Sequence, residues 1–193
     1  MRTFKLHLPA FLAIPLGIAL AIALFSVAPS PSGGNLPDKV IKWQKGQRLS
    51  WKEFQGRPDR MTNMDAMTES GIVFNWSCDW RGFEMEVYAM FDPAKSWVKR
   101  SQATPYLLKH EQAHFDITEI HARKMRKRFE EVGNPCRLGR SGISRLAQQV
   151  YNESAEMQNR YDEETRHSKD EREQARWEKK IVQSLKALEP WAK

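Results

Sequence analysis

Two histidines with a spacing of four residues stand out as chemically capable, in the run His110-Glu111-Gln112-Ala113-His114. On a helix, residues i and i+4 share one face, with their Cβ atoms about 5–6 Å apart. Two imidazoles in that arrangement can bind one zinc ion. Glu111 would lie on the adjoining face, where its carboxylate can take a proton from a water at the metal. The spacing therefore predicts a Zn²⁺ site on a helix, with cobalt or manganese as possible substitutes.

A catalytic zinc usually has a third protein ligand and an open fourth position. The longer motif with a glycine and a third histidine is absent, because Ile117 and Ile120 occupy those positions. His121 comes one position too late and would lie about 16 Å from His110 along a continuous helix. The third ligand is therefore expected from the next helix. The candidates there are Glu153, Glu156, Asp162, Glu163 and His167.

Three helices are predicted to position these residues. Thr104-Pro105 provides an N-cap followed by proline at the first helical position, and Gly133-Asn134-Pro135 is a typical helix end. The paired histidines therefore lie inside a well-capped helix between these two signals. A second helix is predicted from about Ile143 to Arg166 and a third from Asp170 to Leu188.

The segment from Val40 to Arg100 is predicted to form short strands. In residues 83–91, apolar side chains alternate with polar or aromatic ones, which is the period of a half-buried strand. Gly71 to Trp76 is expected to be its antiparallel neighbour, with Cys78 to Gly82 as the connection. The tryptophans of this half are expected to fill the core, with stacking on a ligand as the alternative. The predicted fold class is α+β, with a small antiparallel sheet packed against a zincin-like helix and two further C-terminal helices.

The N-terminal residues are typical of a secretory leader. Arg2 and Lys5 precede a long apolar run, which ends in a small-x-small pattern at Ala28. Pro29 disfavours cleavage, and residues 8–28 are about long enough to span a bilayer. Residues 1–28 are therefore either a cleaved signal peptide or a membrane anchor. Residues 29–38 are predicted to be a flexible linker and residues 39–193 a single zincin-like domain outside the cytoplasm, secreted or periplasmic.

The two cysteines, Cys78 and Cys136, cannot form a four-cysteine zinc site. In an oxidising compartment they are expected to form a disulfide, and the alternative is a pair of buried free thiols.

Composition excludes several function classes. The mean hydropathy of -0.67 excludes a polytopic membrane protein. The chain is mildly basic, with 31 Lys and Arg against 24 Asp and Glu, and it lacks a recognised nucleic-acid-binding module, so no nucleic-acid partner is expected. The densest basic run is expected to be a solvated helix face, with attraction to an anionic membrane as the alternative. That run consists of Arg123, Lys124, Arg126, Lys127 and Arg128.

Four blocks of the chain carry a family resemblance: LSWKEFQG at 49–56, LKHEQAHFDI at 108–117, YDEETRHS at 161–168 and QARWE at 174–178. From about Leu49 to Ile181 the sequence resembles a bacterial family described as predicted secreted zinc-dependent proteases, formally a domain of unknown function. The resemblance implies that His167 is the third metal ligand, ahead of Glu163 and Glu153.

Two further roles are expected beside the metal. Tyr161 is expected to donate a hydrogen bond to an oxyanion beside the metal. Asp116 or Asp162 is expected to orient a ligating imidazole through its second ring nitrogen.

These observations lead to one functional expectation and its rival. The expected function is extracytoplasmic, zinc-dependent hydrolysis of a peptide or protein substrate. Glu111 would be the general base, and His110, His114 and His167 would hold the metal. The alternative is a non-catalytic envelope binding or scaffold protein with a closed, four-ligand zinc site. Hydrolysis of a cell-wall amide would use the same metal chemistry.

Overall fold

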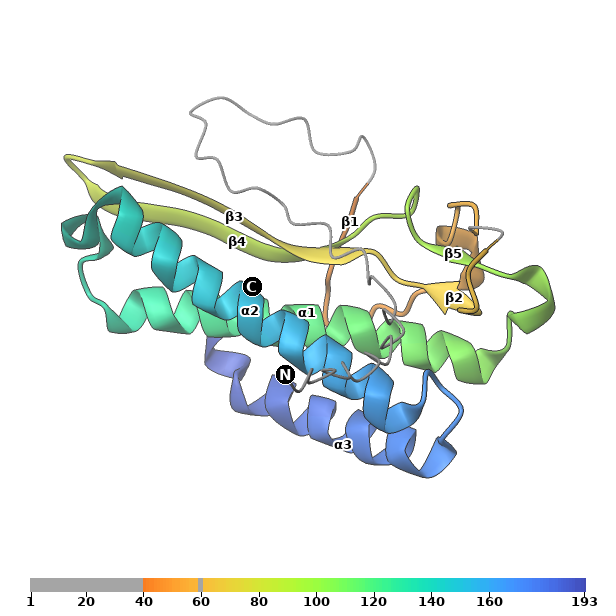
Figure 1. Ribbon diagram of the computed structural model, residues 1–193. Coiled ribbons are helices and arrows are strands. Elements are labelled where there is room, and N and C mark those ends of the chain that lie inside the picture. The colour runs from red at the N-terminus through yellow and green to blue at the C-terminus, as the bar shows by residue number, and fades with distance from the viewer. Residues whose placement is uncertain (1–39, 59–60) are drawn as a thin grey trace, which may run out of the picture. The chain divides into compact units, whose positions relative to one another are not determined.

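The computed structural model describes residues 40–58 and 61–193. The predicted leader or anchor at 1–28 and the predicted linker at 29–38 lie outside these residues. The described chain is a mixture of a small antiparallel sheet, a two-stranded ribbon and three long helices, as the α+β prediction requires (Figure 1).

The strands form two separate antiparallel sheets. The larger has the order β1-β4-β3 and the smaller pairs β2 with β5. The strands are β1 Ile41–Lys42, β2 Ala66–Met67, β3 Ser70–Asp79, β4 Gly82–Phe91 and β5 Trp97–Val98.

Three α-helices and four short 3-10 helices complete the described chain. The α-helices are α1 Pro105–Glu131, α2 Gly139–Thr165 and α3 Glu171–Ala187. The 3-10 helices are η1 Trp51–Glu53, η2 Arg100–Gln102, η3 Pro135–Leu138 and η4 Glu189–Trp191. None of the helices in this part of the chain combines the length and the apolar character needed to cross a bilayer.

The β3–β4 hairpin continues further than the sequence pattern indicated. Pairing runs from Ser70 opposite Phe91 to Asp79 opposite Gly82, which leaves a connection of only two residues. The Asp79 carboxylate accepts a hydrogen bond from the Arg81 backbone N–H at 2.8 Å, and Gly82 adopts a φ of 112°. A tight turn is therefore possible because the side chain before it and the glycine after it both suit the backbone.

The apolar face of this hairpin forms the main core together with α1 and α2. Val87, Ala89 and Phe91 are almost fully buried, as their alternation predicted. On the other side, Phe115 and Phe129 of α1 pack into the same cluster. Figure 1 shows the hairpin along one side of α1 and α3 along the opposite side. Helix α1 is thus the central element of the fold.

The caps of α1 and α3 agree with the sequence. Thr104 accepts a hydrogen bond from the Leu107 backbone N–H at 3.1 Å, and Asp170 accepts one from Glu173 at 3.0 Å. Helix α2 begins earlier than predicted, at Gly139 instead of about Ile143.

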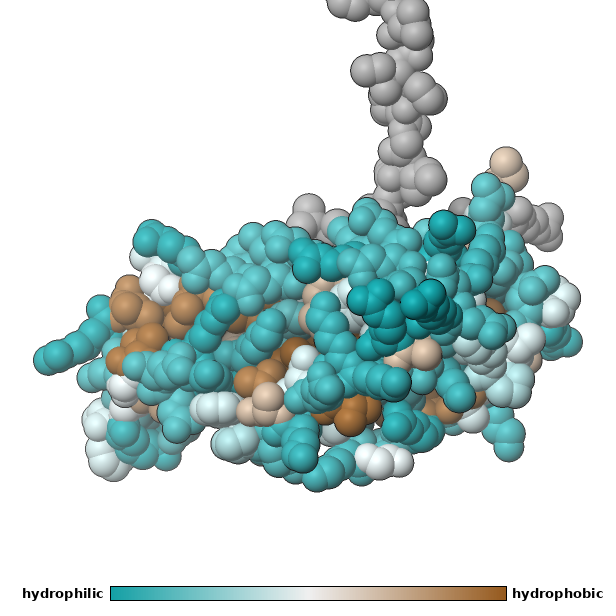
Figure 2. All heavy atoms as spheres, turned by 90° about the horizontal axis from the view of Figure 1, so that it is seen from below, coloured by the Kyte–Doolittle hydropathy of each residue, from teal (hydrophilic) through white to brown (hydrophobic). Residues whose placement is uncertain are grey.

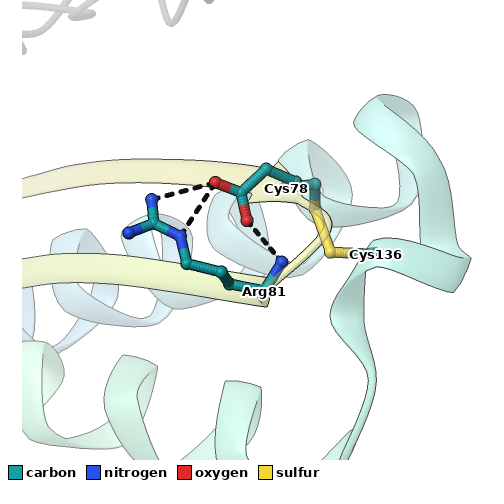
Figure 3. The surroundings of a disulfide bond; sticks show 4 residues. Cys78, Arg81 and Cys136 are labelled. Carbon is teal, nitrogen blue, oxygen red and sulfur yellow. Dashed lines mark hydrogen bonds and ion pairs between the residues drawn. A yellow bond between two sulfur atoms is a disulfide. The ribbon is translucent and has the colours of Figure 1, made fainter.

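A disulfide joins Cys78 at the end of β3 to Cys136 in η3 (Figure 3). The predicted pairing of the two cysteines is therefore confirmed. The bond ties the tip of the hairpin to the connection between α1 and α2.

The basic run on α1 is not a uniformly solvated face, which corrects the expectation from sequence. Arg123 and Arg126 are 1% and 3% exposed. Both guanidinium groups donate to one oxygen of the buried Glu119, at 2.9 Å and 2.8 Å. Arg126 also donates to the carbonyls of Val87 and Trp191, so these charges connect α1 to β4 and to the C-terminal segment.

Candidate metal centre

Three side chains that can hold a metal ion come together between α1 and α2. His110 and His114 extend from consecutive turns of α1, and Asp162 extends from α2. The Nε2 atoms of the two histidines are 3.2 Å apart, and each lies 3.1 Å from Oδ1 of Asp162. Both paired histidines from the sequence motif are therefore at one site.

The spacing of the three donor atoms fits zinc. With metal–ligand bonds of 2.0–2.1 Å, a tetrahedral zinc has ligand atoms separated by about 3.3 Å. The three observed separations are 3.1 Å, 3.1 Å and 3.2 Å. Two imidazole nitrogens and one carboxylate oxygen are also a common donor set for a zinc with an open fourth position.

Gln158 determines which nitrogen of His114 points into the site. Its amide nitrogen donates to the His114 carbonyl at 2.9 Å and to Thr118 Oγ1 at 3.2 Å, which fixes the orientation of the amide. The amide oxygen, 2.7 Å from His114 Nδ1, must therefore accept a hydrogen bond from that nitrogen, which carries the proton. In neutral His114 the Nε2 lone pair then faces the other two donors.

The arrangement requires a positive charge at its centre. The lone pairs of Asp162 and neutral His114 would repel each other at 3.1 Å, unless a proton or a metal ion lies between them. In the metal-free protein the proton takes this place. Burial alone would lower the pKa of His114, but the adjacent Asp162 carboxylate raises it to about 9. Burial opposes ionisation of Asp162, yet the charge on His114 and the hydrogen bonds from both imidazoles hold the pKa of that carboxyl well below its usual range.

His110 is held by packing. Its ring stacks on Tyr161, with ring centroids 4.6 Å apart and an angle of 22° between the planes. Burial lowers the pKa of His110 to about 4, so the imidazole is neutral at physiological pH. Its Nδ1 atom is buried without a hydrogen-bond partner among the described residues.

Tyr161 lies beneath the site rather than at its surface. Its side chain is 0% exposed and contacts His110, His114 and Trp177 through the ring. Its hydroxyl is buried and has no partner in the described part of the chain. The tyrosine thus supports both histidine rings, and its role as an oxyanion donor stays a prediction.

Glu111 occupies a buried position on the side of α1 that faces the strands. Its Oε2 accepts a hydrogen bond of 2.7 Å from the Thr68 hydroxyl, which belongs to the segment between β2 and β3. Burial raises the pKa of Glu111, while the charge on His114 acts in the opposite direction. The carboxylate is therefore held in one orientation and made more basic than a solvated glutamate, as a general base requires.

The third donor beside the two histidines is Asp162, not the preferred His167. His167 is not part of the three-donor group, and its side chain is 62% exposed. Its Nδ1 atom nevertheless lies 3.5 Å from Asp162 Oδ1 at the rim of the site. The 161–168 block alone does not reveal which residue faces α1, because Asp162 lies on α2 and His167 lies in the turn after it. The role of His167 as a metal ligand stays a prediction.

His167 lies in an unusual left-handed turn after α2. Arg166, His167 and Ser168 have φ values of 50°, 51° and 67°. Each such residue costs about 1 kcal/mol relative to right-handed backbone. Two backbone hydrogen bonds of 2.9 Å stabilise the turn, from His167 N–H to the Asp162 carbonyl and from Asp170 N–H to the Thr165 carbonyl.

The other candidate ligands do not join this group of donors. Glu153 accepts two hydrogen bonds from Arg128, at 2.7 Å and 2.8 Å, and Glu163 is exposed. Asp116 does not orient an imidazole, because its carboxylate accepts hydrogen bonds from Trp43 and Gln112 and pairs with Arg48.

His121 is also separate from the site, as its position in the sequence indicated. It is fully buried, and its Nδ1 lies 2.9 Å from the Ile117 carbonyl. Burial lowers the pKa of His121 to about 4.

Two residues of the site were missed in the sequence. Gln158 precedes Asp162 by one helical turn, so its spacing was a usable signal once Asp162 was chosen. Thr68 lies 43 positions before Glu111 and carries no local signal.

The fold and the site together define an α+β domain with an HExxH helix and a His–His–Asp donor group. Residues 89–168 match the model of a family described as "Bacterial protein of unknown function (DUF922)". The matched segment contains α1, α2 and the turn with His167. Neither the curated proteins nor the solved structures contain a significant match to the chain.

Proposed function

We propose that the chain is an extracytoplasmic zinc-dependent peptidase. His110, His114 and Asp162 would hold the metal, and Glu111 would act as the general base. The observation that carries the proposal is the convergence of three donor atoms within 3.2 Å, where either a proton or a metal ion can balance the Asp162 charge. A buried glutamate one residue after the first histidine supports catalysis in addition to binding.

Zinc bound by this donor set would supply Lewis-acid chemistry, which activates a water at neutral pH and polarises a carbonyl group. The protein's own residues would handle the proton. Glu111 would accept it from the attacking water and later return it to the leaving amine. The Thr68 hydroxyl would keep the carboxylate in its orientation, and Gln158 would keep the lone pair of His114 directed at the metal.

The edge of the larger sheet offers a place for an extended substrate. Strand β3 is the last strand in the order β1-β4-β3, so its outer backbone groups have no partner strand within the described sheet. Ser70, at the start of β3, contacts Thr118 of α1 at 2.8 Å, one turn after His114. A peptide that pairs with this end of β3 would therefore lie near the metal.

Metal content and hydrolysis of a broad set of peptides test the proposal together. Wild-type protein should bind one equivalent of zinc, and Asp162→Ala should lose most of it. Glu163→Ala is the matched control, because it removes an exposed acid from the neighbouring position. Glu111→Gln should keep the zinc and lose hydrolysis. No zinc in the wild type after reconstitution, or full hydrolysis by Glu111→Gln, would contradict the proposal.

A structural zinc site in a binding or scaffold protein is the second candidate. It is supported by the 3.5 Å separation between His167 Nδ1 and Asp162 Oδ1, which brings a fourth donor to the rim of the site. In this case the cobalt-substituted protein should have the absorption spectrum of a closed, four-ligand tetrahedral site. His167→Ala should change that spectrum. A spectrum that is the same in both proteins and responds to added small anions would instead indicate an open position.

Two features support a location outside the cytoplasm. The chain forms a disulfide, which persists mainly in oxidising compartments. The N-terminal residues have the charge and apolar run of an export signal.

A further inference from the structure

The end of the domain that carries the disulfide exposes several large apolar side chains. Five large apolar side chains are exposed among the described residues: Met61, Trp80, Val132, Leu138 and Val182. Three of them lie close in sequence to the two cysteines. Trp80 is two residues after Cys78, while Val132 and Leu138 lie within four residues of Cys136. We call Trp80, Val132 and Leu138 the disulfide tip.

Trp80 contributes most to this surface. Its side chain is 92% exposed at the turn between β3 and β4, whereas Trp97 and Trp177 are 5% and 2% exposed. The expectation that tryptophans of this half fill the core therefore fails at this position. The turn is a two-residue connection, and the neighbouring disulfide attaches it to η3 (Figure 3). The indole is thus presented to solvent on a constrained backbone.

In Figure 2, hydrophobic side chains are visible at the end of the domain where the hairpin tip and the α1–α2 connection lie and also near the middle of this face, among hydrophilic side chains. Leu138 and Val132 are 40% and 37% exposed at this end.

Next to the disulfide tip, η3 and the first half of α2 carry only positive charges, whereas Glu130 and Glu131 at the end of α1 precede Val132. From Gly133 to Asn152 the chain contains Arg137, Arg140 and Arg145 and no aspartate or glutamate, and all three arginines are exposed. Asp79 lies 3.0 Å from Arg81, and Glu131 lies 3.7 Å from Lys127.

We propose that the disulfide tip docks onto the surface of an anionic phospholipid bilayer. A tryptophan side chain is most stable at the level of the lipid headgroups, where the ring is in an apolar layer and the indole N–H meets polar groups. Valine and leucine beside it enter the same layer, and arginines around them meet the lipid phosphates. This inference is independent of the metal site.

A second copy of the chain fits this surface less well. A stable protein–protein interface uses about 20–30 residues on each side around an apolar core. The disulfide tip has three exposed apolar side chains at the end of a hairpin, and its exposed arginines would face the same arginines in a symmetric pair. A lipid surface needs only a few inserted side chains and supplies the opposite charge.

Hydrogen exchange of the full chain in nanodiscs tests the proposal. The chain is reconstituted into zwitterionic discs and into discs with about one third anionic phospholipid. Because residues 8–28 are present in both samples, any difference reports on the rest of the chain. Amide exchange in residues 79–84 and 132–140 should be slower in the anionic discs by about threefold or more.

Variants separate the contributions of the indole and of the arginines to this difference in exchange. Trp80→Ser should remove most of this difference, and Arg137→Gln with Arg140→Gln should reduce it. Val182→Ser is the matched control, because it removes an exposed apolar side chain from α3, and should leave the difference unchanged. All the altered side chains are exposed, so circular dichroism should report an intact fold for each variant.

Two results would overturn the inference. One is equal exchange of these residues in both kinds of disc. The other is slowing that depends on protein concentration and not on lipid charge, since it would identify a second copy of the chain as the partner.

Discussion

Replacing Glu119 by glutamine removes the negative charge that lies between two buried guanidinium groups. One carboxylate oxygen accepts hydrogen bonds from Arg123 at 2.9 Å and from Arg126 at 2.8 Å. All three side chains are 4% exposed or less. Glutamine has almost the same shape and keeps an acceptor oxygen, so the substitution changes the charge with little change in packing.

The magnitude follows from the surroundings of the two arginines. Breaking a buried ion pair by removing one partner costs about 3–5 kcal/mol. Arg123 keeps a second carboxylate, since Glu189 lies 3.1 Å away, whereas Arg126 keeps only carbonyl oxygens among its observed partners. We therefore expect Glu119→Gln to lower the free energy of unfolding by about 3 kcal/mol, near the lower end of that range. In a domain of this size, the corresponding decrease in Tm is about 6–12 °C.

Urea and thermal unfolding of two variants provide the assay. Glu131→Gln is the control, because it makes the same substitution on the same helix at an exposed pair, 3.7 Å from Lys127. That variant should change stability by about 0.5 kcal/mol or less. If Glu119→Gln also remains within about 1 kcal/mol of the wild type, the reasoning about the buried charges is wrong.

Three further predictions concern other parts of the domain. Gln158→Leu should weaken zinc binding about 10–100-fold in chelator competition, because His114 loses the acceptor for its second ring nitrogen; unchanged affinity would contradict the assigned tautomer. Replacing Cys78 and Cys136 by alanine should lower stability in urea by about 4 kcal/mol, given their separation of 58 residues; a change below about 1 kcal/mol would refute this. His121 has a pKa of about 4 in the folded protein and 6.5 as its reference value, so the unfolded chain binds the extra proton first. The free energy of unfolding should therefore decrease by up to about 3 kcal/mol as the pH falls from 6.5 towards 4. His121→Gln should remove this part of the acid dependence, and an unchanged pH profile in the variant would contradict the prediction.

The elements whose signals are local could be predicted from the sequence. The boundaries of α1 followed from Thr104 and Pro105 at one end and Gly133 at the other, because caps act within a few residues. The alternation in residues 83–91 predicted which face of β4 is buried. The two histidines of the motif met because their spacing of four residues brings them together on any regular helix.

The remainder of the site depends on how two helices are rotated relative to each other. The buried positions Ile143, Ala147, Val150 and Tyr161 show which side of α2 faces the core. Asp162 follows the last of these and lies at the edge of that side. Its position therefore indicated that it faces α1, although the 161–168 block favoured His167. The contact between Thr68 and Glu111 joins a loop to a helix, so no periodicity in the sequence could reveal it.

The basic run on α1 shows a different limit of prediction from sequence. Arg123 follows Glu119 by four residues and Arg126 follows it by seven, which places all three on one face of the helix. That spacing predicts an ion-pair network, but charged residues are so rarely buried that composition favoured a solvated face. The burial arises because η4 and β4 cover this face and supply backbone carbonyls to the guanidinium groups.

The choice between a catalytic and a structural metal site rests on the fourth position, and the packing around each donor favours the catalytic one. His114 is held by Gln158, and His110 is held by stacking on Tyr161. His167, in contrast, is 62% exposed and approaches the group only through Asp162, at 3.5 Å. A closed structural site needs four donors that packing holds equally well. Two donors held by their neighbours and a fourth residue exposed at the rim fit the proposed open site, and the buried Glu111 beside them fits the proposed general base.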